Sequence, residues 1–225
     1  MTLGLHRVRV WDLPTRVFHL ALIVSVVGAW SCAQLGGNAM VWHFRFGYAV
    51  CALLLFRLVW GLVGGRWSRF VHWAFRPGAV LRYWQGRPAP GERFDVGHSP
   101  LGALSVLTLL GLVALQVSTG LFADDDIANV GPLNRFISAQ QAAWLTAVHQ
   151  KTGQWLLPGW IGMHVAAAFY YQWIKRRRII SAMISGDQWA AADTPASDDG
   201  RQQRGLALLI ALAAGALVAW CVTLL

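Results

Sequence analysis

Five stretches of the chain are almost free of charged residues, and each is about as long as a bilayer-spanning helix. They run from Val17 to Gln34, Val41 to Val63, Pro100 to Phe122, Trp144 to Ile174 and Leu206 to Leu225. About 20 apolar residues in an α-helix cross the hydrocarbon core. The pattern therefore predicts five transmembrane helices. The fourth is long enough to tilt or protrude, and Pro158-Gly159 in its middle predicts a kink.

Polar segments separate these stretches. Gly36-Gly37-Asn38 predicts a short turn, whereas residues 64–97 form a long loop rich in arginine. Within that loop, Pro77 to Gln85 predicts a short helix at the membrane interface. Residues 123–143 form the second long loop, and residues 190–204 are polar and typical of a linker.

The composition agrees with a membrane protein. Hydrophobic residues make up 56% of the chain and charged residues 13%, and the mean hydropathy is +0.45. We expect an all-α integral membrane protein with a four-helix transmembrane bundle over residues 7–187. A polar linker over residues 188–204 and a fifth transmembrane helix over residues 205–225 follow. The first apolar stretch is too long for a cleavable signal, so we expect it to remain as a helix.

The distribution of basic residues predicts the orientation. Fifteen of the 19 lysines and arginines lie in three segments: three before the first span, six after the second and six after the fourth. The loops on the opposite side carry Asp124, Asp125 and Asp126 with the single Arg135. The positive-inside rule therefore places the N-terminus in the cytoplasm and the C-terminus in the periplasm of a bacterial inner membrane. The net charge of +9 thus reflects topology and does not indicate nucleic-acid binding.

Four histidines, His19, His43, His149 and His164, lie inside or at the edge of these apolar stretches. An imidazole without a partner is costly there, so such residues are functional candidates. His149 and His164 are 15 residues apart, which is roughly 22 Å along a continuous helix. With the predicted topology, His43 and His149 lie near the periplasmic face, and His19 and His164 lie nearer the cytoplasm.

Only one of the three ways to pair these histidines matches the depths: His43 with His149, and His19 with His164. Facing helices can supply two axial imidazoles to a haem, so the pattern predicts two non-covalent b-type haems, one near each face. Cys32, Cys51 and Cys221 have no spacing for covalent haem attachment and are expected to be buried thiols. The alternatives are core histidines bonded to carbonyls, or zinc, which usually needs more ligands than two histidines.

Three further residues, Arg57, His98 and His72, need separate interpretation. Arg57 lies near the depth of the cytoplasmic haem, where it could bind a haem propionate or extend to the interface. His98, at the start of the third span, could bind a propionate, exchange protons at a quinone pocket, or be an ordinary interfacial residue. His72 in the arginine-rich loop is expected to be a surface residue.

The chain contains several short motifs in a fixed order: Trp11–His19, Phe56–Gly61, Arg69-Phe70, Gly97–Gly102, His149–Gly153 and Ala182–Gly186. Together they resemble the bacterial cytochrome b561 and nickel-iron hydrogenase b-type cytochrome superfamily. The resemblance covers residues 7 to about 187, and it implies that the four matching histidines ligate two b haems. The fifth span lies outside this region, and we expect no cofactor role for it.

The preferred hypothesis is a dihaem cytochrome that moves electrons across the inner membrane between quinone and a periplasmic partner such as a cytochrome c. Such an electron-transfer protein could also have quinol or quinone oxidoreductase activity. One alternative is the membrane anchor of a hydrogenase or another dehydrogenase that delivers electrons to quinone. Another is a non-redox transporter or assembly factor. The acidic residues Asp124 to Asp126 could attract a basic partner, or simply be solvated loop residues.

Overall fold

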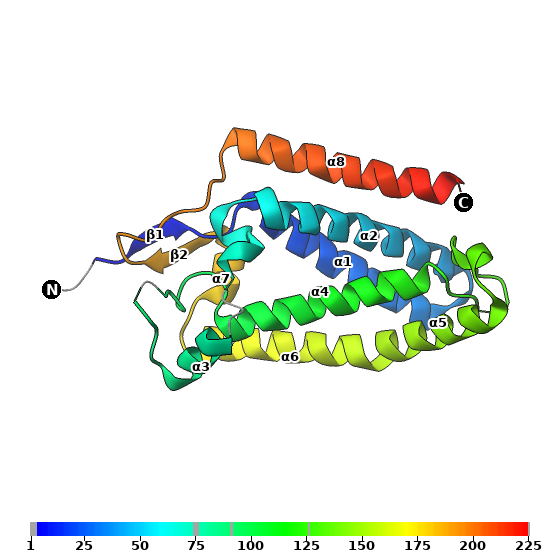
Figure 1. Ribbon diagram of the computed structural model, residues 1–225, viewed down its shortest axis with the longest axis horizontal. Helices are drawn as coiled ribbons and strands as arrows, with labels where there is room; N and C mark the ends of the chain where they lie inside the picture. Colours follow the sequence, from blue (N-terminus) through cyan, green and yellow to red (C-terminus); the bar gives the residue numbers. More distant parts are fainter. Residues whose placement is uncertain (1–3, 74–76, 91, 126, 225) are drawn as a thin grey trace. The chain divides into compact units, whose positions relative to one another are not determined.

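The structure is a computed structural model that describes residues 4–73, 77–90, 92–125 and 127–224. Almost all of its secondary structure is helical (Figure 1). The long helices are α1 (Leu13–Leu35), α2 (Met40–Val63), α4 (Pro100–Gly120) and α8 (Arg201–Leu224). Each of these is long and apolar enough to span a membrane. The remaining elements are β1 (His6–Arg9), η1 (Gly37–Ala39), η2 (Arg66–Ser68), η3 (Phe70–His72), α3 (Pro77–Gln85), η4 (Asn134–Phe136), α5 (Ala139–Lys151), η5 (Thr152–Leu156), α6 (Leu157–Phe169), η6 (Tyr170–Ile174), α7 (Ile179–Ser185) and β2 (Asp187–Ala190).

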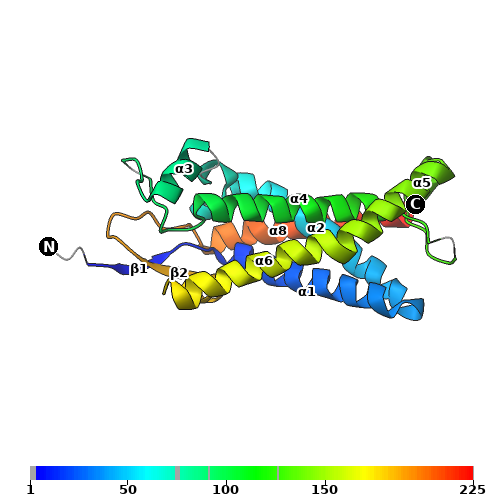
Figure 2. The same ribbon diagram turned by 90° about the horizontal axis from the view of Figure 1, so that it is seen from below.

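The fourth predicted span is present as one continuous helical path, α5–η5–α6–η6, which Figure 2 shows running without a break from α5 into α6. The predicted kink takes the form of a π-helical turn. Leu157 N–H donates to Thr152 O, five residues earlier. The next residue, Pro158, has no N–H to donate, so the regular pattern is interrupted at this point.

The spans that contain α1 and α5 begin four and five residues before the predicted positions because capping residues extend them. Asp12 accepts the N–H of Thr15 at 2.8 Å and caps α1. By contrast, α4 begins at the predicted residue, Pro100, and Ser99 accepts the N–H of Gly102 there at 3.2 Å. Ser138 and Gln141 form a capping box that starts α5 five residues before Trp144. Hydropathy does not detect these polar first turns. The short helix predicted over residues 77–85 has the bounds of α3.

The chain divides into two compact units. Unit 1 contains the described residues of 1–18, 58–108 and 164–209, and unit 2 contains those of 19–57, 109–163 and 210–225. In unit 2, segments of four helices share one apolar cluster. Val50 and Leu54 of α2 pack there with Leu22 of α1, Val113 of α4 and Leu157 of α6. Within unit 2, this is the packing that a four-helix bundle requires.

Unit 1 contains a feature that the sequence did not predict. The strands β1 and β2 pair antiparallel, with His6 opposite Ala190 and Arg9 opposite Asp187 (Figure 1). The apolar side of this small sheet packs with Trp11, Val96 and Ala182. The first residues of the predicted linker over residues 188–204 therefore belong to a strand, and its last four belong to α8.

The middle of the predicted linker is bonded to the rest of unit 1. Ser197 N–H donates to Arg9 O at 2.7 Å, and Ser197 Oγ donates to Val10 O at 2.7 Å. Trp67 Nε1 donates to Pro195 O at 2.9 Å. The segment between β2 and α8 thus connects α8 to the sheet through specific hydrogen bonds.

Candidate functional site

Two of the four predicted histidines meet in unit 2. His43 lies in the first turn of α2, and His149 lies near the end of α5. Their ring centroids are 5.9 Å apart and the ring planes are nearly perpendicular, at 89°. Both residues are half-buried. The predicted depths paired these two histidines, and α2 and α5 bring their imidazole rings together.

The hydrogen bonds of these rings define which nitrogen carries the proton. His43 Nδ1 lies 2.9 Å from Ala29 O, and His149 Nδ1 lies 3.0 Å from Gln116 O. A backbone carbonyl can only accept a hydrogen bond, so each Nδ1 must carry the hydrogen. In a neutral imidazole the lone pair then resides on Nε2, which is the nitrogen that can ligate a metal.

This arrangement fits two axial ligands of one haem iron. Two metal–nitrogen bonds of about 2 Å each, with a ring-centre offset of about 1 Å at each end, place the centroids about 6 Å apart. The observed separation is 5.9 Å. Ligating histidines usually donate their other N–H to a carbonyl or carboxylate, as both rings do here. The pair therefore passes this geometric test for a b-type haem.

Gly120, the last residue of α4, leaves the space that the His149 ring occupies. A Cβ atom at Gly120 would lie 2.8 Å from Cε1 and 3.1 Å from Nδ1 of His149. Real side chains do not approach this closely, so a larger residue would displace the imidazole. This role could not be predicted from the sequence, because a glycine at a helix end is common for other reasons.

Thr152 and Gly153, which follow His149, contact Gln116, the residue whose backbone carbonyl orients the His149 ring. Thr152 Oγ donates to Gln116 Oε1 at 3.1 Å, and a Cβ at Gly153 would lie 2.2 Å from Gln116 Nε2. Gln116 is also the residue whose backbone carbonyl accepts from His149. The motif His149–Gly153 thus supplies both an imidazole and the contacts that hold Gln116 in α4.

The other two histidines lie in different units. His19 is a half-buried residue of α1 in unit 2, and His164 is a half-buried residue of α6 in unit 1. Their pairing stays a prediction. Arg57 is buried in α2, with 4% of its surface exposed, which argues against extension of its side chain to an interface.

His98 lies at the wall of a pocket in unit 1. Its ring centroid is 4.7 Å from that of Trp11 and 4.5 Å from that of Trp73. The pocket has a volume of about 280 Å³, and Arg66, Trp67, His72 and Phe94 also line it. Partial burial, followed by the charges of Arg66 and Arg69, lowers the pKa of His72. His72 is exposed, as predicted, and it also lines this pocket, which was not predicted.

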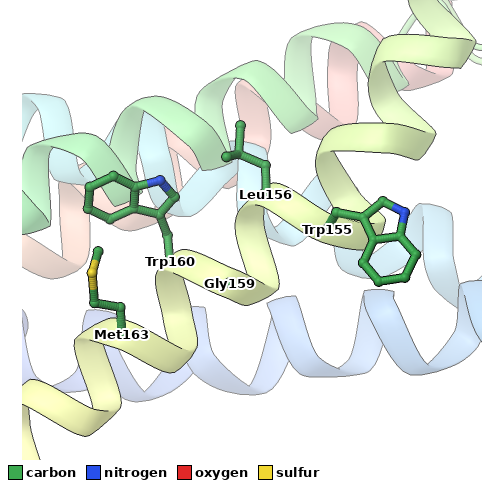
Figure 3. Close-up of a pocket in the computed structure, with 5 residues that line it drawn as sticks. All are labelled: Trp155, Leu156, Gly159, Trp160 and Met163. Atoms are coloured by element: carbon green, nitrogen blue, oxygen red, sulfur yellow. The ribbon is translucent and has the colours of Figure 1, made fainter.

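A second hollow, of about 260 Å³, lies along the helix that contains Pro158. Figure 3 shows it lined by Trp155, Leu156, Gly159, Trp160 and Met163. It is wide open, and Trp155 is 72% exposed. The lining has no imidazole, thiol or carboxylate, so we give it no role in the chemistry.

The acidic loop is organised mainly around Asp125. Its carboxylate accepts the N–H groups of Ile127, Ala128 and Asn129 and the side-chain amide of Asn129. The Asn129 side chain, followed by these backbone N–H groups, holds the pKa of Asp125 well below its usual range. Asp125 therefore closes its own loop and stays ionised at neutral pH. Asp126 lies outside the described residues.

Comparison with known proteins places these residues in a wider context. Residues 10–186 match the sequence model of a family described as "Prokaryotic cytochrome b561". A Bradyrhizobium diazoefficiens protein named "Probable Ni/Fe-hydrogenase B-type cytochrome subunit" is 24% identical, over 82% of this chain and 87% of its own length. The Escherichia coli K12 protein named "Probable Ni/Fe-hydrogenase 1 B-type cytochrome subunit" is 23% identical, over 80% and 86%. No solved structure matches the chain.

Proposed function

The chain belongs to the prokaryotic cytochrome b561 family, and we propose that it is a dihaem cytochrome that exchanges electrons between quinone and a periplasmic redox partner such as a cytochrome c. Family membership and the apolar helices support a multi-pass membrane b-type cytochrome with a role in electron transfer. The number of haems, the quinone, the partner and the orientation across the inner membrane are the finer parts of the proposal.

The observation that carries the proposal is the His43–His149 pair, with both Nδ1–H groups donated to backbone carbonyls. These two residues would hold the external haem. A b-type haem supplies reversible one-electron chemistry when it is bound. With both imidazoles as ligands, such a haem would serve electron transfer and not oxygen binding.

For the cytoplasmic haem we propose His19 and His164 as the ligands. We include Arg57, which is buried in α2, in this site because a guanidinium forms strong ion pairs with carboxylates such as a haem propionate. The distribution of arginine along the loops supports a cytoplasmic N-terminus.

His98 and its pocket are where we place the quinone headgroup. Trp67, Trp73 and Phe94 give the pocket flat aromatic walls, and His98 supplies a group suited to proton exchange. Oxidation of a quinol releases two protons as well as two electrons, so a proton acceptor at this position matches the chemistry.

A second candidate function is the membrane anchor of a hydrogenase. It is supported by the printed names of the relatives, which describe hydrogenase cytochrome subunits. Purified wild-type protein distinguishes the two candidates. Rapid reduction by quinol followed by oxidation by a c-type cytochrome supports the first, whereas reduction by hydrogen only in the presence of a co-purified hydrogenase supports the second.

The ligand assignment is tested by haem content. We expect a b-type spectrum with two haems per chain in the wild type, and one haem in His43→Ala, His149→Ala and the double variant of both. His19→Ala should remove the other haem. His6→Ala and His72→Ala, which change exposed histidines, are matched controls that should retain both. A wild-type chain without a b-type spectrum would overturn the proposal, and loss of the same haem in His19→Ala and His149→Ala would overturn the pairing.

A further inference from the structure

Thr119 is buried beside His149, with 3% of its surface exposed. It lies in the last turn of α4, and its Oγ is 2.7 Å from Leu115 O and 3.3 Å from His149 Nδ1. Neither the sequence motifs nor the proposed ligand set includes this threonine. Its hydroxyl contacts the ring nitrogen that faces away from the proposed iron position.

The direction of the hydrogen bond follows from the neighbouring groups. His149 Nδ1 must carry a hydrogen, because Gln116 O accepts from it at 3.0 Å. Thr119 Oγ can therefore only accept from Nδ1. Its own hydrogen is directed at a backbone carbonyl, and Leu115 O is the nearest at 2.7 Å. The hydroxyl thus presents a lone pair to the imidazole N–H.

The two histidines consequently differ. In the described part of the chain, the Nδ1–H of His149 has two acceptors, Gln116 O and Thr119 Oγ, and that of His43 has one, Ala29 O. An acceptor on Nδ1–H draws the proton away from the ring and makes Nε2 a stronger electron donor. A stronger donor stabilises the oxidised form of a bound iron and lowers its reduction potential.

We propose that Thr119 is a positioning residue that lowers the midpoint potential of the external haem by accepting a second hydrogen bond from His149. The inference rests on the proposed function, because it requires His149 to be an axial ligand. It adds a control of the potential that the ligand set alone does not contain.

The test is a redox titration of purified protein, followed by the visible spectra of the two haems. Thr119→Val removes the acceptor with almost no change of shape, and we expect the potential of one haem to rise while the other is unchanged. Thr119→Ser restores a hydroxyl and should return the potential toward the wild-type value. In a His19→Ala background, which retains only the external haem, the same rise should occur.

Thr108→Val is the matched control. Thr108 also lies in α4 and donates to a carbonyl four residues earlier, Leu104 O, at 3.0 Å, but it is only half-buried. We expect no change of either potential. If Thr119→Val lowers haem occupancy, Thr119→Ala removes the same acceptor with a smaller side chain and serves instead.

The outcomes separate this inference from the proposed function. Unchanged potentials in Thr119→Val and Thr119→Ala with both haems bound would overturn the role of Thr119 and leave the ligands intact. An equal shift of both haems, or no recovery in Thr119→Ser, would also overturn it. A wild-type protein without haem would instead refute the proposed function.

Discussion

The two units hold their key polar side chains in different ways. In unit 2, His43 and His149 are oriented by the backbone carbonyls of Ala29 and Gln116. In unit 1, the buried carboxyl group of Asp12 accepts from several neighbours, among them Ser68 Oγ at 2.6 Å and Gly65 N–H at 3.2 Å. Unit 2 thus relies on helix carbonyls with the one hydroxyl of Thr119 beside His149, whereas unit 1 builds a polar network from side chains and loop backbone.

This difference has a physical reason. Each additional buried polar side chain in an apolar medium is costly, whereas a helix carbonyl is already present and retains a second lone pair. Orienting the imidazoles by carbonyls therefore adds no charged group near the proposed haem. Unit 1 contains the described part of the long arginine-rich loop and the small sheet. Its segments are far apart in sequence, and a buried carboxyl group with several donors can fasten them together.

We expect the largest effect from a substitution at Gly120 in unit 2, because it fills the space that the His149 ring occupies. We expect Gly120→Ala to displace the His149 ring and to remove the external haem, so that the purified protein holds one haem per chain. The physical reason is the 2.8 Å separation between the added Cβ and His149 Cε1. The measurement is the ratio of haem to protein.

Gly111→Ala on the same helix is the control, because a Cβ there has nothing within 4 Å. We expect both haems to be retained, with helix stability unchanged or slightly improved by up to about 1 kcal/mol. Two haems of wild-type spectrum in Gly120→Ala would show that the space beside His149 is not required.

The network around Asp12 gives the next largest effect. Asp12→Ala leaves the N–H groups of Thr15 and Gly65, the hydroxyl of Ser68 and Trp60 Nε1 without the carboxyl acceptor. Because Asp12 and Trp60 are fully buried, water cannot easily replace the lost carboxyl group as an acceptor. We expect a loss of about 3 kcal/mol in the free energy of unfolding.

The loss is measured by denaturant titration of the solubilised protein. Asp95→Ala, at an exposed aspartate of the same unit, should change the unfolding free energy by less than about 0.5 kcal/mol. Equal effects of the two substitutions would show that the hydrogen bonds of Asp12 contribute no more than a surface aspartate does.

Hydropathy and charge predicted the helices well because these properties act over whole segments. The predicted span over residues 41–63 agrees with α2 to within one residue, and the α3 prediction has the observed bounds. His43 and His149, which the predicted depths paired, have ring centroids 5.9 Å apart. Each of these predictions depends on the position of a residue along a single helix, which periodicity and length define.

The contacts between distant segments could not be predicted in the same way. Thr119 and Gly120 are ordinary residues for the end of a helix, and only the approach of α5 gives them a role toward His149. The polar composition of the predicted linker gave no sign of its partners near the start of the chain, such as Val10, whose carbonyl accepts from Ser197 Oγ 187 residues later. No local pattern encodes such a partner, although Asp12 before Leu13-Pro14 is a recognisable capping signal.

The smallest effect concerns Asp199 in unit 1, which joins the start of α1 to α8. Its carboxylate accepts from Leu13 N–H at 2.9 Å and forms ion pairs with Arg9 and Arg204, both at 3.1 Å. Burial by itself raises the pKa of Asp199, but the hydrogen bonds from Arg204 and Leu13 and the charges of Arg204 and Arg9 outweigh it. The pKa is therefore held below its ordinary value.

A lowered pKa means that the folded state binds this proton less readily than the unfolded state does. The stabilisation is then complete above the ordinary aspartate pKa of about 4 and is lost as the pH falls below it. Because both arginines are partly exposed, we expect the contribution to be about 1 kcal/mol or less. Asp199→Asn should be less stable than the wild type at pH 7, and the difference should shrink below about pH 4. A difference that stayed constant from pH 7 to pH 3 would show that Asp199 acts through its shape or its hydrogen bond to Leu13, and not through its charge.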